Sequence, residues 1–248
     1  MKLLAFDSST EVLSIALSLD GNVTSYSGEG GPKASAVILP QIQLILTSAN
    51  IQLTDLDGIA FGAGPGAFTG VRVACGVAQG LGYGANIPVV GINTLLAVAQ
   101  ASGYHKVIVC LDARMGEIYH AAFINENGQW HEQSATQVCK PQAAPEILVT
   151  HNEANLNTFL KTGDATHAGD WVGVGNAWAI YSDALHAIYA NHLTNINTHI
   201  TPSAEAILQL AAPIFAAGLG KPASEAMPIY IRNHVALTTL EREAGHRL

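Results

Sequence analysis

The stretch from residue 59 to residue 72, which reads IAFGAGPGAFTGVR, constrains the fold more strongly than any other part of the sequence. The apolar run that opens it predicts a buried strand, and the small and apolar residues after it predict a helix. Gly62, Gly64 and Gly66 can adopt backbone angles that are closed to other residues, and Pro65 stiffens the turn. A strand that enters a helix through such a loop predicts an α/β fold whose free N–H groups could hold an anion.

The same loop excludes two common nucleotide-binding folds. A Walker A loop needs a lysine near the start of the helix to reach the phosphates, and this segment has none. A dinucleotide-binding loop needs an acidic residue further along to hold a ribose, but residues 58–111 contain neither Asp nor Glu. An ordinary P-loop ATPase and a Rossmann dehydrogenase are therefore both ruled out.

A duplicated strand pattern predicts two related lobes. Apolar runs at residues 3–6 and 12–19 flank Asp7, and similar runs at 107–111 and 118–124 flank Asp112. Each set reads as a β-meander that is followed by strands and helices, which is typical of α/β lobes. We therefore predict an N-terminal lobe over residues 1–103 and a C-terminal lobe over 104–248. The helix expected at 203–217 could pack back on the first lobe.

Six residues form a candidate nucleotide-binding set because they lie in turns or loops that follow strands: Asp7, Ser8, Gly64, Gly66, Thr69 and Asp112. Each aspartate could orient a phosphate or a metal-bound water, but each could equally bond the N–H groups of its own turn. The turn function is favoured for Asp7, because Ser8, Ser9 and Thr10 follow it. In the second repeat, Arg114 and Glu117 are expected to form a local ion pair.

The helix after the glycine loop carries two rows of small residues at four-residue spacing. One row runs from Gly66 to Gly82 and the other contains Gly76, Gly80 and Gly84. Such rows allow a neighbouring element to approach closely. The rows by themselves favour a neighbour in the same lobe, and the alternative is a neighbour in another subunit. This alternative has a physical motive, since each glycine destabilises a helix by about 1 kcal/mol relative to alanine.

Composition narrows the class of protein further. The net charge is −8 with only 11 Lys and Arg residues, so the chain has no basic surface with which to bind nucleic acid unaided. The odd number of cysteines (Cys75, Cys110, Cys139) suits a reducing compartment, and we expect core thiols in a cytoplasmic protein. The apolar run at 73–92 reads as a buried helix and strand rather than a membrane span. No histidine spacing indicates a metal site, and no motif indicates a serine hydrolase.

Four motifs carry a resemblance to a known family. They are LAFDSSTE at residues 4–11, GPGAFTGVR at 64–72, DARMGEIY at 112–119 and PIYIRN at 228–233. With them, the chain resembles the TsaB family of bacterial tRNA threonylcarbamoyladenosine (t6A) biosynthesis proteins. The resemblance implies an actin-like ATPase (ribonuclease H-like) fold, with two lobes that each hold a mixed sheet, a meander and flanking helices.

The resemblance also implies a function without catalysis. TsaB proteins are degenerate relatives of TsaD, which transfers threonylcarbamoyl from its adenylate to the adenosine beside the tRNA anticodon. TsaD-like chains carry a metal-binding HxxxH motif where this chain has Thr94 and Val98. We therefore expect no catalytic residues, no metal and no cofactor, with weak ATP or ADP binding within the complex left open. This chain also departs from the family pattern at Ala34, where most members have a histidine.

The partners implied by the resemblance are TsaD and the ATPase TsaE, with a homodimer when the chain is alone, indirect contact with tRNA and no membrane. The partner interface is expected on the helices at 36–49 and 68–84. The residues that it predicts are Ile38, Ile42, Ile45, Gly70, Val71, Ala74, Val77, Ala78 and Leu81.

Two other classes of function stay open at this point. One is an autonomous glycoprotease-like peptidase or ATPase, which the missing lysine, metal ligands and triad disfavour. The other is a plain homodimeric binding module that uses the same pair of helices.

Overall fold

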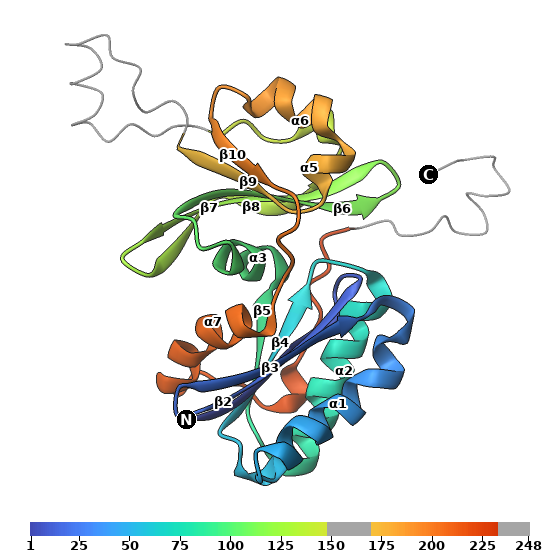
Figure 1. Ribbon diagram of the computed structural model, residues 1–248, viewed down its shortest axis with the longest axis vertical. Helices are drawn as coiled ribbons and strands as arrows, with labels where there is room; N and C mark the ends of the chain where they lie inside the picture. The colour runs from blue at the N-terminus through green and yellow to red at the C-terminus, as the bar shows by residue number, and fades with distance from the viewer. Residues whose placement is uncertain (148–169, 233–248) are drawn as a thin grey trace, which may run out of the picture.

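The computed structural model describes residues 1–147 and 170–232, and these residues form two lobes along the long axis of the molecule (Figure 1). Each lobe is built on a five-stranded mixed sheet. The first sheet has the order β3-β2-β1-β4-β5 and contains β1 (Lys2–Asp7), β2 (Val12–Leu19), β3 (Asn22–Glu29), β4 (Gly58–Gly64) and β5 (Val89–Asn93). The second has the order β10-β9-β6-β7-β8 and contains β6 (Lys106–Arg114), β7 (Glu117–Glu126), β8 (Gln129–Cys139), β9 (Trp171–Val174) and β10 (Leu193–Asn197).

The two sheets have the same topology. In the first, β1 pairs antiparallel with β2 and parallel with β4. In the second, β6 pairs antiparallel with β7 and parallel with β9. Each sheet is thus a three-stranded meander with two parallel strands added at the free edge of its first strand. This arrangement confirms the predicted fold class of two related lobes, each with a mixed sheet and a meander.

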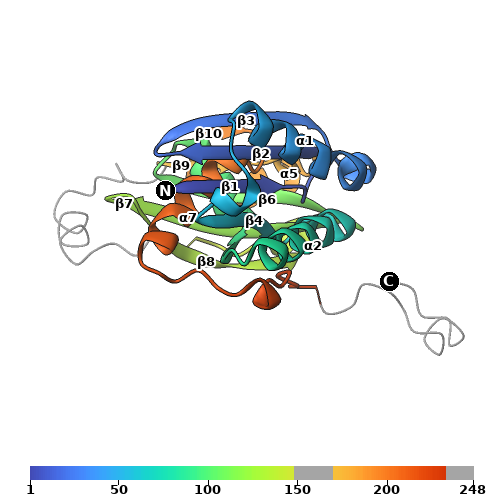
Figure 2. The same cartoon turned by 90° about the horizontal axis from the view of Figure 1, so that it is seen from below.

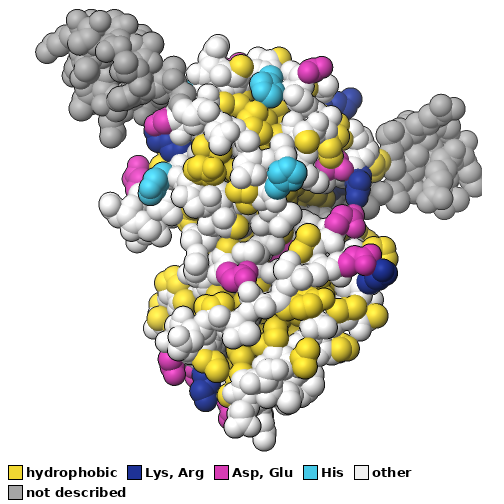
Figure 3. All heavy atoms as spheres, viewed as in Figure 1, with side chains coloured by type: hydrophobic (Ala, Val, Ile, Leu, Met, Phe, Trp, Pro, Cys, Tyr) yellow, Lys and Arg dark blue, Asp and Glu magenta, His cyan; other side chains and the backbone are white. Residues whose placement is uncertain are grey.

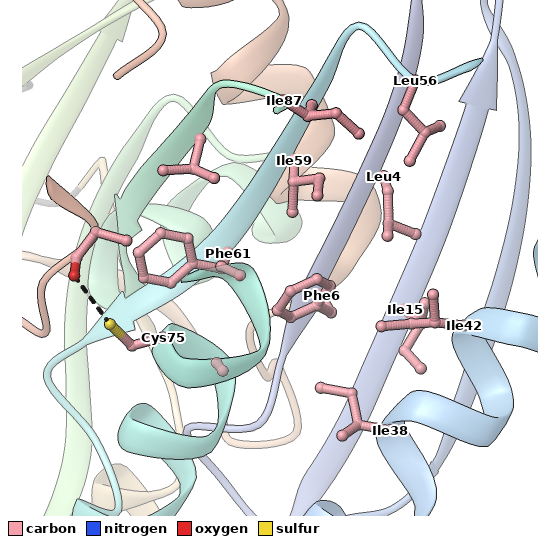
Figure 4. Packing of buried hydrophobic residues seen from close by; sticks show 14 of the residues in the cluster. Leu4, Phe6, Ile15, Ile38, Ile42, Leu56, Ile59, Phe61, Cys75 and Ile87 are labelled. Carbon is pink, nitrogen blue, oxygen red and sulfur yellow. Dashed lines mark hydrogen bonds between the residues drawn. The ribbon is translucent and has the colours of Figure 1, made fainter. Parts of the chain in front are cut away.

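Helices cover both faces of the first sheet. α1 (Ala34–Ser48) and α2 (Phe68–Ala85) lie on one face, and α7 (Ala204–Ala216) lies on the other (Figure 2). Because side chains alternate along a strand, Leu4 and Phe6 face α1 and α2, whereas Leu3 and Ala5 face α7. Figure 4 shows the core on the α1 and α2 face, where strand residues pack against Ile38 and Ile42.

α3 (Thr94–Ser102) lies between the two sheets (Figure 1). Leu95 and Val98 pack against the second sheet, and the Gln100 amide donates to Gln209 of α7 at 2.6 Å. The other face of the second sheet is covered by α5 (Ala177–Ile180) and α6 (Ser182–Tyr189). The two helices are separated at Tyr181, which leaves helical geometry with φ −119° and ψ 36°.

Short 3₁₀ turns connect several of these elements: η1 (Gly31–Lys33), η2 (Leu53–Asp55), η3 (Pro141–Ala143) and η4 (Ala223–Glu225). None of the helices in the described ranges is both long and apolar enough to cross a bilayer. The run at 73–92 forms most of α2 and of β5, so it is a helix followed by a strand as predicted, but α2 buries only one of its faces.

The chain after α7 returns along the first lobe and reaches the second. Lys221 pairs with Val89 at the edge of β5, and the Ile229 N–H donates to the Ala63 carbonyl oxygen at 2.7 Å. Beyond this point, Arg232 donates to the Ala113 carbonyl oxygen of the second lobe at 3.0 Å. We refer to residues 221–232 as the C-terminal strap.

Candidate functional site

A cleft of about 300 Å³ opens between the two lobes beside the glycine loop and Asp112. The first lobe lines it with residues 9–12 and 65–68, and the second lobe lines it with residues 111–114 and Tyr119. Residues 229–232 of the C-terminal strap form a further part of its wall. The glycine loop and both sequence repeats therefore meet at this cleft.

The glycines of the loop serve close packing between α2 and the turn after β1. A Cβ atom on Gly70 would lie 1.8 Å from the Ser8 carbonyl oxygen, and one on Gly66 would lie 2.6 Å from the Ser9 carbonyl oxygen. Two hydrogen bonds hold this contact: Ser8 Oγ donates to the Gly70 carbonyl oxygen at 2.8 Å, and the Ala67 N–H donates to the Ser9 carbonyl oxygen at 2.7 Å. Residues with side chains would separate the two segments.

Asp7 is fully buried at the end of β1 beneath this contact. Its Oδ1 accepts from the Ser9 N–H at 2.9 Å and from the Ser9 hydroxyl at 2.8 Å, which is the turn function favoured by the sequence. Its Oδ2 has no partner among the described residues and lies where a Cβ on Gly62 would be. Burial raises the pKa of Asp7 to about 6, and the two bonds from Ser9 oppose that shift.

The six predicted nucleotide-binding residues do not converge on one open site. Asp7, Ser8 and Gly64 are buried, and the last of these lies against Val71 and the Ile229 carbonyl oxygen. Thr69 is exposed but does not line the cleft. Only Gly66 and Asp112 line it, and they come from opposite lobes.

Asp112 is also engaged within its own lobe. Its Oδ1 accepts from the Arg114 N–H at 3.0 Å and from the Tyr181 hydroxyl at 3.2 Å, and its Oδ2 is paired with the Arg114 guanidinium at 3.4 Å. These contacts engage both oxygens of the carboxylate within the second lobe.

The predicted ion pair between Arg114 and Glu117 is wrong. Arg114 reaches across the cleft to Glu11 of the first lobe at 3.0 Å, and Glu117 pairs with Arg232 of the C-terminal strap at 2.5 Å. Arg114 and Met115 both have positive φ, so the β6–β7 hairpin turns the Arg114 side chain away from Glu117. Glu11 and Glu117 thus each pair with an arginine from a segment that is distant in the sequence.

The strap residues are the functional candidates that the sequence reasoning missed. Tyr230 accepts a hydrogen bond from Arg72 Nε at 2.7 Å, and Arg232 bridges to the second lobe. Both lie in the PIYIRN motif, which supported the family resemblance but suggested no role for either residue. The PIYIRN motif was therefore the sequence feature that could have indicated a role for Tyr230 and Arg232.

The structure also corrects which residues of α1 and α2 could meet a partner. Seven of the nine predicted interface residues are buried in the chain's own core: Ile38, Ile42, Ile45, Gly70, Val71, Ala74 and Ala78. They hold the two helices on the sheet, and only Val77 and Leu81 are half-buried at the margin. A partner on these helices would have to contact the opposite, exposed face.

That exposed face of α2 follows one helical stripe: Thr69, Arg72, Gly76, Gly80 and Tyr83. A Cβ atom on Gly76, Gly80 or Gly84 would meet nothing within 4 Å. Packing within the described residues therefore explains the row of small residues from Gly66 to Gly82. It does not explain the row of Gly76, Gly80 and Gly84. On α1, Leu39 and Leu44 are 49% and 58% exposed on the solvent side.

Thr94 and Val98, where the family resemblance implies metal-binding histidines in TsaD-like chains, lie on α3. Thr94 is buried and its hydroxyl donates to Ser9 Oγ at 3.4 Å, and Val98 is buried against the second sheet. A valine side chain offers no lone pair to a metal. The described residues contain no group of three His, Cys, Asp or Glu side chains that could hold a metal ion.

Comparison with known sequences agrees with the family resemblance. A family model described as TsaD, tRNA N6-adenosine threonylcarbamoyltransferase, matches residues 32–239. The tRNA threonylcarbamoyladenosine biosynthesis protein TsaB of Escherichia coli (strain K12) is 36% identical over 241 residues, which cover 95% of this chain and 96% of that protein. The TsaB protein of Haemophilus influenzae is also 36% identical, over 95% of both chains.

Solved structures show the same relationship. A structure of YeaZ from Pseudomonas aeruginosa matches with a TM-score of 0.77 and 31% identity, and the match covers 92% of this chain and 99% of that one. A Pseudomonas aeruginosa protein described as similar to peptidase YEAZ matches with a TM-score of 0.79 and 32% identity. Identity at this level over nearly the full length of both chains shows common descent, and the chain belongs to the TsaB family.

Proposed function

We propose that this protein is a non-catalytic subunit of the machinery that transfers threonylcarbamoyl to the adenosine beside the tRNA anticodon. In this proposal it acts in the cytoplasm by pairing with the catalytic subunit TsaD, and TsaE is the further partner. Membership of the TsaB family supports a role in t6A biosynthesis, since its relatives are named for that process.

The observation that carries the non-catalytic part of the proposal is the chemistry of α3. The TsaD family model matches most of the chain, yet the two positions expected to hold metal ligands are Thr94 and Val98. Val98 lies in the apolar core with Leu95 and Val109, where a metal ion would have neither ligands nor water. The two-lobe scaffold is therefore retained while the ligand pair is replaced.

The exposed face of α1 and α2 supports the pairing part of the proposal. Gly76 and Gly80 each destabilise α2 by about 1 kcal/mol relative to alanine, and no neighbour in the described residues requires their small size. A partner helix that approaches this stripe closely would require it. Figure 3 shows the first lobe from the side of β3 and α1, where hydrophobic side chains are visible and the charged groups lie mostly at the margins. The same face would form the homodimer when TsaD is absent.

A reconstitution experiment tests both parts. We expect the purified chain to leave tRNA unmodified when it is given threonylcarbamoyl adenylate, and to stimulate modification when TsaD and TsaE are added. Modification of tRNA by the chain alone would refute the non-catalytic assignment. Turnover of ATP or a peptide by the chain alone would instead support an autonomous enzyme.

The interface is tested with Gly80→Leu and a matched control, Ala216→Leu on α7, which lies on the opposite side of the sheet. Both changes add a leucine at an exposed helical position. We expect Gly80→Leu to weaken binding to TsaD by about tenfold or more, because the side chain separates the two helices. Its melting temperature should not fall, because leucine favours helix over glycine. Equal binding by the two variants would place the interface elsewhere.

A further inference from the structure

A stacked cluster stands at the exposed N-terminal end of α2, where the glycine stripe meets the cleft. The Arg72 guanidinium carbon lies 3.3 Å from the centroid of the Phe68 ring and 5.4 Å from that of the Tyr230 ring. The two rings are 6.4 Å apart, and Arg72 Nε donates to the Tyr230 hydroxyl at 2.7 Å. We refer to these three residues as the Arg72 stack.

The stack is exposed but held in position. Phe68 and Tyr230 are 47% and 53% exposed, whereas large aromatic side chains are usually more deeply buried. Tyr230 belongs to the C-terminal strap, which is fixed just before it by the bond from Ile229 to Ala63 and just after it by Arg232. Little conformational freedom would therefore be lost if a ligand bound the stack.

Arg72 differs from the other two arginines of the described residues in its charge environment. Arg114 is paired with Glu11 and Asp112, and Arg232 is paired with Glu117. Arg72 forms no ion pair within residues 1–147 and 170–232. Its Nε donates to the Tyr230 hydroxyl. The two Nη atoms at the other edge of the guanidinium have no hydrogen-bond acceptor within residues 1–147 and 170–232. This edge matches the two oxygens of a carboxylate.

We propose that the Arg72 stack is a preformed anchor for a carboxylate of the protein partner that docks on α2. The inference rests on the proposed function, since Arg72 lies on the same exposed stripe as Gly76 and Gly80 and would be covered by the same partner. Arginine and tyrosine are the residues most enriched where binding energy concentrates in protein interfaces. Stacking of the guanidinium on the Phe68 ring weakens its hydration and favours a close ion pair.

A protein carboxylate fits the site better than an RNA phosphate. Glu11, Asp112 and Glu117 lie at the neighbouring cleft mouth and balance the charges of Arg72, Arg114 and Arg232. A polyanion would meet no net positive charge there, whereas a single carboxylate can bind to one unpaired arginine.

The test compares the affinity of the full chain for purified TsaD in four forms: native, Arg72→Met, Arg72→Lys and the control Arg114→Met. Methionine keeps much of the stacking stem of Arg72 and removes its charge. We expect Arg72→Met to weaken binding by about tenfold or more and to reduce its dependence on salt. Arg72→Lys should recover only part of the loss, because an ammonium lacks the planar fork. Arg114→Met should stay within about threefold of the native value, because Arg114 lies in the second lobe rather than on the α2 stripe and its side chain is 74% exposed.

Several results would overturn the inference. Binding of Arg72→Met within about threefold of the native affinity would show that no carboxylate is anchored there. Unchanged affinity for TsaD together with weaker binding of tRNA to the assembled complex would assign the stack to a phosphate instead. If the native chain itself does not bind TsaD, the proposed function fails, and that outcome is distinct from the failure of the anchor alone.

Thermal unfolding of each variant checks that it is folded. Tyr230→Phe, which keeps the ring and frees Arg72 Nε, provides a second variant that should weaken binding by about twofold to fivefold.

Discussion

Two buried titratable residues, one in each lobe, have pKa values that burial shifts in opposite directions. Asp7 in the first lobe has its pKa raised to about 6 by burial. His120 on β7 of the second lobe has its pKa lowered to about 4, also by burial. The Tyr189 hydroxyl donates to the Pro145 carbonyl oxygen at 2.5 Å, so it accepts from His120 Nε2 at 2.9 Å, and His120 is held as the neutral Nε2–H tautomer.

These shifts predict opposite effects of acid on stability. The folded state binds a proton at Asp7 more readily than the unfolded state, so lowering the pH from about 6 toward 3.8 removes an unfavourable buried charge and raises stability. At His120 the unfolded state takes up the proton first, so lowering the pH from 6.5 to about 4 reduces stability. Each effect amounts to about 3 kcal/mol, and in the native protein they largely cancel.

Asp7→Asn should expose this cancellation. The amide keeps an oxygen for the Ser9 bonds but no longer titrates, so only the His120 effect remains. We expect the free energy of unfolding of the variant, measured in urea at several pH values, to fall between pH 6 and 4 by about 2 to 3 kcal/mol more than that of the native protein. Parallel pH profiles for the two proteins would mean that Asp7 is not protonated in the folded state in this range.

At the scale of the element, α2 uses glycine for two different purposes. Gly70 allows contact with the turn after β1, where a Cβ would overlap the Ser8 carbonyl oxygen, whereas Gly76 faces open space. The same amino acid change should therefore have opposite effects at two positions six residues apart.

Alanine substitutions test this difference in unfolding experiments. Gly70→Ala should destabilise the protein by about 2 kcal/mol or more, because α2 must move away from the Ser8 turn. Gly76→Ala should stabilise the isolated chain by up to about 1 kcal/mol through helix propensity. If both variants were destabilised, Gly76 would have an internal packing role that the structure does not show.

The contrast also explains which parts of the molecule could be predicted from the sequence. The meanders and the course of α2 follow from local periodicity, so these elements were predicted well. The choice of interface residues required knowing which face of α2 the chain's own sheet covers, and small residues such as Gly70 and Gly76 look alike in the sequence. The Arg72 stack joins residues 158 positions apart, and no periodic pattern links them.

At the scale of the whole molecule, the lobes are connected through α3, α7 and the C-terminal strap. α3 packs on the second sheet and bonds to α7, and α7 packs on the first sheet although it follows the second lobe. The C-terminal strap adds a third connection through Arg232, whose guanidinium contacts both the Ala113 carbonyl oxygen and Glu117.

The strap connection leads to a prediction about local motion. Arg232 is largely buried, with 16% of its side chain exposed, whereas the Arg114 side chain that spans the cleft to Glu11 is 74% exposed. An exposed ion pair contributes little to stability, and a partly buried, hydrogen-bonded one contributes more, here about 1 to 3 kcal/mol. Arg232→Met should therefore speed hydrogen exchange at the strap amides, including that of Ile229, by about tenfold. Arg114→Met should leave their exchange nearly unchanged, and β1 should stay protected in both variants because its bonds lie in the core of the first lobe. Equal exchange at the strap in the two variants would show that it is held by its contacts with α2 and β4 alone.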